Sequence, residues 1–202
     1  MRIKTLGILI AGALLMAGGA VYFIAQRAPS SKNISDQQTP YLAQTYVDAP
    51  SLWAMRLPTG WEYSTSKADP IAVTFRGPAG TPEERITVQV LTAATELGGG
   101  TWKDLTDAAE EQRTEIKAIG TNVRLTEPET VEYLTATQET LKALQWLAEF
   151  DFQGANVRRW QIAVMRPDNK TIHIITYAAP STVYPQYETL AKQIIQTWWM
   201  KE

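Results

Sequence analysis

The chain has 202 residues, of which 45% are hydrophobic and 20% charged, an ordinary balance for one folded domain with appendages. It contains no cysteine, which excludes disulfides, thiolate metal sites, cysteine catalysis and a lipid-modified N-terminal cysteine. Four basic residues precede Asn33, and the rest of the chain carries 15 basic and 21 acidic residues, a net charge of −6. This charge argues against nucleic acid or an anionic membrane surface as the main partner.

An uncharged apolar segment lies near the N-terminus, at residues 6–25, with Arg2 and Lys4 before it. Twenty helical residues, at about 1.5 Å each, cover a hydrocarbon core of about 30 Å. We therefore predict that residues 1–26 form a transmembrane signal anchor or a cleaved signal peptide. Residues 18–20 are small enough for processing, but the apolar run continues beyond them, where a cleaved signal normally turns polar. This continuation favours the anchor.

Residues 27–50 are rich in Ser, Asn, Gln and Pro and show little apolar periodicity, which predicts a flexible tether. Because the segment before the anchor is short, we expect the C-terminal part to be exported. The protein would then be a single-pass membrane protein with its C-terminal domain in the periplasm or, in a photosynthetic organism, in the thylakoid lumen.

Residues 51–202 have the pattern of one α+β domain. Alternating or β-branched segments predict strands at 52–57, 61–63, 71–75, 86–91 and 146–152, a hairpin over 157–178, and an extended segment at 122–133 interrupted by Pro128. The span 140–152 is ambiguous, because Leu141, Leu144 and Leu147 also suit a helix.

Two helices are predicted in this domain. The first follows the glycines at 98–100, with Thr101 and Asp104 as a capping box, and runs from Leu105 to Gly120. The second begins after a cap at Ser181 or Thr182, tolerates Pro185 in its first turn, and carries an apolar stripe as far as Trp198. The expected fold is an antiparallel β-sheet flanked by helices, an α/β/α sandwich, preceded by one transmembrane helix.

Several of these features together resemble the PsbP/DcrB superfamily, over about residues 50–199. They are a strand ending in Pro58-Thr59-Gly60-Trp61, a long helix in the middle of the chain, the strand pair around Trp160 and Tyr177, and a closing helix with Tyr184, Tyr187 and Trp198. The resemblance implies a PsbP-like domain in which Pro58, Gly60 and Trp61 are a signature of the fold. It also implies extracytoplasmic proteins that bind or help to assemble membrane complexes, with photosystem II subunits, DcrB and LpqN-type proteins as branches. Many bacterial members are lipoproteins, and this chain lacks their cysteine.

The sequence does not predict a catalytic, cofactor or metal site. Its one histidine, His173, alternates with isoleucines in a predicted strand and has no nearby nucleophile motif, which favours a structural or exposed role. Glu127, Glu129 and Glu132 lack the spacing of a calcium loop and predict a solvated acidic surface. The glycines at 98–100 lack the phosphate-binding patterns and predict a strand-to-helix turn.

The sharpest interaction candidate is Trp199. Adjacent helical residues point about 100° apart, so we expect Trp198 to be buried and Trp199 to be partly exposed, for packing at the helix end or for contact with a partner or the membrane interface. The sequence favours a non-enzymatic, membrane-anchored binding or assembly factor for a membrane protein complex. A carrier or receptor for a small apolar ligand, bound between sheet and helix, is the alternative.

Overall fold

The structure is a computed structural model that describes residues 42–66 and 70–200. The predicted anchor at 1–26 and most of the predicted tether lie outside these residues. Within the described part of the chain, no helix combines the length and apolar character needed to cross a membrane.

The main sheet has eight strands, and every paired strand in it is antiparallel to its neighbour. Its order is β3-β4-β5-β10-β9-β8-β6, with β7 pairing with β8 beside β6. The strands in this order are β3 (Glu62–Thr65), β4 (Ile71–Arg76), β5 (Thr87–Ala94), β10 (Thr171–Pro180), β9 (Ala155–Met165), β8 (Thr140–Phe152), β6 (Thr121–Leu125) and β7 (Glu129–Leu134). The predicted strands and the break at Pro128 are confirmed.

A second, three-stranded sheet has the order β1-β2-β11 and is antiparallel throughout. Its strands are β1 (Gln44–Asp48), β2 (Trp53–Leu57) and β11 (Trp199–Met200). The strand expected at 52–57 is therefore present, and β1 lies within the range predicted as tether, so the folded part begins before residue 51. The five residues of β1, which lies between Pro40 and Pro50, are too few to show the two-residue period clearly.

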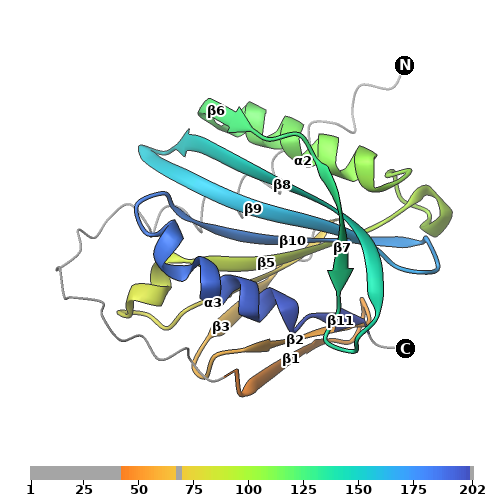
Figure 1. Cartoon of the computed structure of the whole chain (residues 1–202), viewed down its shortest axis with the longest axis horizontal. Coiled ribbons are helices and arrows are strands. Elements are labelled where there is room, and N and C mark those ends of the chain that lie inside the picture. The colour runs from red at the N-terminus through yellow and green to blue at the C-terminus, as the bar shows by residue number, and fades with distance from the viewer. Residues whose placement is uncertain (1–41, 67–69, 201–202) are drawn as a thin grey trace.

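Two helices cover opposite faces of the main sheet. Helix α2 (Leu105–Ile119) packs on β8, β9 and β6, whereas α3 (Tyr184–Gln196) packs on β10 and on β2 of the small sheet (Figure 1). The strand period divides the side chains between the two layers: Ile172 and Ile174 join the core under α2, and Ile175 and Tyr177 join the core under α3. Two short 3-10 helices, η1 (Pro82–Arg85) and η2 (Glu96–Gly98), complete the elements. The α+β sandwich is confirmed.

The span 140–152, ambiguous in sequence, is one continuous strand. Its buried side chains alternate, because Leu141 and Ala143 face the α3 layer while Trp146, Ala148 and Phe150 face the α2 layer. The leucines that suggested a helix instead pair across the sheet, as Leu144 does with Ala163. Gln153 and Gly154, at φ 50° and 80°, form the tight turn into β9.

The N-terminus of α2 corrects the predicted capping box. Asp104 is itself the N-cap, and its side chain accepts hydrogen bonds from the backbone N–H groups of Thr106 at 2.8 Å and Asp107 at 3.0 Å. Asp is a preferred N-cap because its short carboxylate reaches these free N–H groups and interacts favourably with the helix dipole.

We expect Asp104→Ala to lower the free energy of unfolding by about 1 kcal/mol, because two backbone donors lose their acceptor. Thr101→Ala is the matched control, since the structure gives Thr101 no capping bond, and its unfolding midpoint in urea should equal that of the parent protein. Equal losses in the two variants would contradict the observed cap.

Helix α3 also departs from the prediction at both ends. Its N-cap is Val183, without a side-chain bond, rather than Ser181 or Thr182, while Pro185 stands in the first turn as expected. The helix ends at Gln196, and Thr197 caps it as its hydroxyl donates to the carbonyl of Ile194 at 2.6 Å. Trp199 is therefore a strand residue, and a helical angle between two tryptophans does not explain its exposure.

Candidate functional site

The small sheet closes the α3 side of the domain, and its inner side is part of the core. Trp53, Met55 and Leu57 are completely buried there, and Met200 packs against the same cluster. Trp53 contacts Tyr46 and Phe75, with ring centroids 5.3 and 6.2 Å apart. These contacts fix the small sheet on the main one.

The outer side of the small sheet carries a row of apolar side chains. Val47 pairs with Ala54, and Ala54 pairs with Trp199, so the three residues lie side by side on one face. Val47 is 43% exposed and Trp199 partly exposed, whereas Ala54 between them is buried. A leucine follows at the end of this hairpin: Leu52, in the turn before β2, is 41% exposed. We call these four residues the apolar face.

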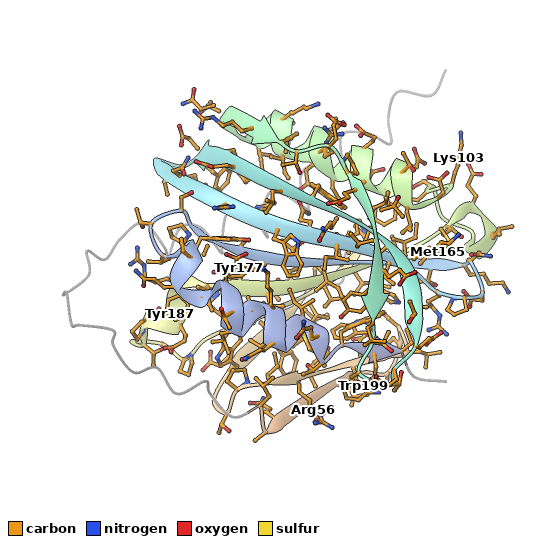
Figure 2. The ribbon with its side chains drawn as sticks, viewed as in Figure 1. Arg56, Lys103, Met165, Tyr177, Tyr187 and Trp199 are labelled. Carbon is orange, nitrogen blue, oxygen red and sulfur yellow. The ribbon has the colours of Figure 1, made fainter. Side chains whose placement is uncertain are left out.

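The backbone around the apolar face is held firmly. Leu52 has φ 54°, a left-handed conformation that costs a branched residue free energy and that glycine or asparagine would adopt more easily. Thr197 joins α3 to β2, because its hydroxyl accepts from the N–H of Arg56 at 2.8 Å and lies 3.1 Å from the Arg56 carbonyl. Figure 2 shows Arg56 and Trp199 together at one edge of the molecule, away from Lys103.

The residues Pro58, Gly60 and Trp61 form the turn from β2 to β3. The N–H of Trp61 donates to the carbonyl of Pro58 at 3.3 Å, and Gly60 has φ 84°, where a side chain would be strained. Trp61 is 3% exposed and belongs to the core under α3. The motif therefore has a physical role: the turn directs the tryptophan inward.

His173 lies in the core under α3 and is fully buried. Its Nδ1 is 3.1 Å from the Thr92 hydroxyl, its ring is 5.3 Å from that of Trp198, and its Nε2 has no hydrogen-bond partner among the described residues. Burial, with a smaller contribution from Arg166, lowers the pKa of this imidazole to about 3, although Asp48 and Asp168 act in the opposite direction. The ring is neutral near pH 7 and sits inside the domain, out of reach of a substrate in solvent.

The acidic residues singled out by sequence do not converge. Glu127 pairs with Arg113 at 2.9 Å, with its own side chain 86% exposed, and Glu129 accepts from Gln145. Glu132, on β7, is exposed. Among the described residues, no three His, Asp or Glu side chains lie close enough together to hold a metal ion.

A buried polar network under α2 is absent from the sequence prediction. The indole N–H of Trp146 donates to Gln161 at 3.0 Å, and the Gln161 amide lies 3.4 Å from the hydroxyl of Thr176. Gln161 is 1% exposed. The alternating pattern of its strand predicts which side of the sheet Gln161 faces, but it does not predict its hydrogen-bond partners. These bonds satisfy the buried amide within the sheet, which indicates a structural role.

Large side chains fill the layer between the main sheet and α3. Tyr177, Tyr184, Tyr187 and Trp198 are all at most 2% exposed. The Tyr177 hydroxyl donates to the carbonyl of Tyr184 at 2.8 Å, and burial raises the pKa of both phenols. These aromatic side chains therefore belong to one packed core between the sheet and α3.

Comparison with known proteins finds a likeness in structure alone. No family model matches the sequence, and no curated protein matches it. The solution structure of PsbP (CyanoP) from Synechocystis matches with a TM-score of 0.52 and 14% identity, covering 82% of this chain and 97% of that one. LpqN of Mycobacterium tuberculosis, described as involved in cell envelope biogenesis, matches with a TM-score of 0.52 and 13% identity, over 74% of this chain and 83% of its own.

A eukaryotic protein has the same architecture. The Ran-binding protein Mog1p of Saccharomyces cerevisiae matches with a TM-score of 0.50 and 10% identity, covering 78% of this chain and 94% of that one. At these identities the likeness concerns the fold. The resemblance predicted from the sequence is confirmed at that level: the described domain has the PsbP-like fold that PsbP, LpqN and Mog1p share.

Proposed function

We propose that the protein is a non-enzymatic binding or assembly factor for a membrane protein complex, held on the extracytoplasmic side by residues 1–26. The proposal keeps the predicted organisation of an anchor, a tether and a PsbP-like domain. Only the boundary changes, because β1 belongs to the folded domain. The apolar face is its docking surface, and Trp199 is the principal contact residue.

The apolar face is the observation that carries the proposal. Val47, Leu52 and Trp199 leave apolar surface exposed, although the inner side of the small sheet already packs on the core, so these three side chains are not needed to form that core. Tryptophan is common where binding energy concentrates at protein interfaces, since one ring offers a large contact area and an N–H donor. The left-handed φ of Leu52 adds to this support, because strained residues cluster at functional positions.

The structural relatives are compatible with such a role. Mog1p is described as Ran-binding, and LpqN as involved in cell envelope biogenesis. A photosystem would be one membrane complex consistent with the PsbP likeness, and the purification below identifies the target. The second function considered, a carrier of a small apolar ligand, has less support because large aromatic side chains fill the space under α3.

We expect Trp199→Ala to reduce capture of the partner complex at least tenfold, while the melting temperature stays close to that of the parent. The measurement is affinity purification of the tagged full-length chain in mild detergent, with mass spectrometry of the captured proteins. Leu97→Ala is the matched control, since Leu97 is an apolar side chain, 74% exposed, that lies outside the small sheet in η2.

Two results would contradict this proposal. Recovery of the tagged protein alone would remove the membrane complex as partner. Equal capture by the Trp199 and Leu97 variants would show that the complex binds through another surface.

A further inference from the structure

The apolar face lies at the point where the chain enters the folded domain. Among the described strands, β1 comes first in the chain, begins at Gln44 and carries Val47. We propose that, until a complex binds, the apolar face rests in the interface of the same bilayer that holds the anchor, so that the domain has a fixed orientation on the membrane. This inference rests on the proposed anchor and deepens it by naming the surface and its lipid partner.

The length of the connection makes this contact feasible. Residues 26–43 link the predicted span to β1. Eighteen residues extend to about 60 Å at most, and a flexible chain of this length has a typical end-to-end distance of about 25 Å. The domain therefore stays within about its own diameter of the lipid headgroups, and the small sheet is the part attached most directly to the connection.

The chemistry of the outer face suits a lipid interface. The outward positions of β1 and β2 hold Thr45, Val47, Ala54 and Arg56, and β11 contributes Trp199, so these described strands place no carboxylate on this side. Tryptophan partitions to the boundary between headgroups and acyl chains, and arginine extends its charged end toward phosphates while its stem covers apolar surface. The domain as a whole is acidic, which favours zwitterionic over anionic lipids.

The small size of the apolar face is sufficient for a lipid contact within a tethered molecule. A stable interface between separate proteins buries about 800 Å² on each partner, so a bound complex would also cover residues around these three partly exposed side chains. A contact within a tethered molecule needs far less affinity, because the tether holds the local concentration at about the millimolar level. A weak apolar contact is then occupied most of the time.

The absence of cysteine allows a direct test on the full-length chain. Leu52→Cys and, as a matched exposed leucine, Leu97→Cys would each be spin-labelled and reconstituted in phosphatidylcholine nanodiscs. We expect the ratio of oxygen to nickel-chelate collisions to be at least threefold higher at position 52, as for a label within the lipid interface. Adding Val47→Ser and Trp199→Ser to Leu52→Cys should return this ratio to that at position 97, with unchanged circular dichroism as the check on folding.

The outcomes separate the inference from the proposed function. A protein that stays in the nanodisc with equal ratios at 52 and 97 overturns the lipid contact and leaves the anchor intact. A protein that does not enter the nanodisc overturns both the lipid contact and the proposed anchor. Shielding at 52 that appears only after solubilised membrane proteins are added assigns the apolar face to a protein partner and overturns the lipid contact.

Discussion

Replacing Trp198 with alanine is expected to lower the free energy of unfolding by about 3–5 kcal/mol, the usual cost of removing a large aromatic side chain from a core. Trp198 is completely buried, with its ring centroid 5.9 Å from that of Tyr133 and 5.3 Å from that of His173. Its backbone also joins two segments, since its carbonyl accepts from the N–H of Ala136 in the loop after β7 and its own N–H donates to the carbonyl of Ile195 in α3. The variant leaves a cavity that these neighbours cannot close.

The adjacent Trp199 provides the control for this prediction. Trp199→Ala should lower the free energy of unfolding by about 1 kcal/mol or less, because its ring is partly exposed on the outer side of the small sheet. Urea unfolding followed by far-ultraviolet circular dichroism measures both variants without relying on tryptophan fluorescence. Comparable losses in the two variants would contradict the assignment of one tryptophan to the core and the other to the surface.

Acidification is expected to destabilise the protein through His173. The unfolded imidazole titrates near pH 6.5 and the buried one at a pKa of about 3, so between these values the unfolded state binds the extra proton. Stability contributed by the neutral ring is complete above pH 6.5 and falls by about 1.4 kcal/mol for each pH unit below it. The expected loss from this residue between pH 7 and pH 4.5 is about 2–3 kcal/mol.

The main cause of the lowered pKa is burial of the ring, which disfavours the charged imidazolium, and the surroundings of the ring also offer no acceptor for a second ring proton. An imidazolium would carry N–H donors on both nitrogens, and Nε2 has no partner among the described residues. A His173→Gln variant stays neutral at every pH tested, so the difference in unfolding free energy between parent and variant should narrow or reverse as the pH falls from 7 to 4.5. A difference independent of pH would show that His173 titrates with the same pKa in both states.

The central sheet could be predicted because its strands repeat with a clear period of two residues. The hairpin of β9 and β10 follows directly from this period, and helix α2 follows from residues spaced three and four apart along one helical face. The span 140–152 is harder to predict, because its leucines are spaced three residues apart as in a helix, whereas the residues from Trp146 to Phe152 alternate as in a strand. Pairing with β9 makes the whole span one strand. The ends of the helices depend on individual hydrogen bonds, such as that from the Thr197 hydroxyl to the Ile194 carbonyl. Helix propensity does not predict such bonds.

The apolar face could be predicted only in part. Trp199 was identified because a tryptophan pair at a helix end places one ring outside, although the structure explains its exposure by strand pairing with Ala54. The sequence does not single out Val47, because β1 is short and lies in a polar, proline-containing segment. Leu52 was assigned to a strand, and its left-handed turn conformation has no signal in the residue type. Contacts between distant segments, here β1, β2 and β11, bring these residues together.

The most direct test of the account is the membrane topology of the full-length chain. A version with a C-terminal epitope tag would be expressed in a Gram-negative bacterium, and its membranes washed with alkaline carbonate. We expect the protein to remain in the membrane pellet and the tag to be removed when protease is added to intact spheroplasts. Release into the carbonate wash, or a tag that stays protected until the spheroplasts are lysed, would contradict an extracytoplasmic domain held by an N-terminal anchor.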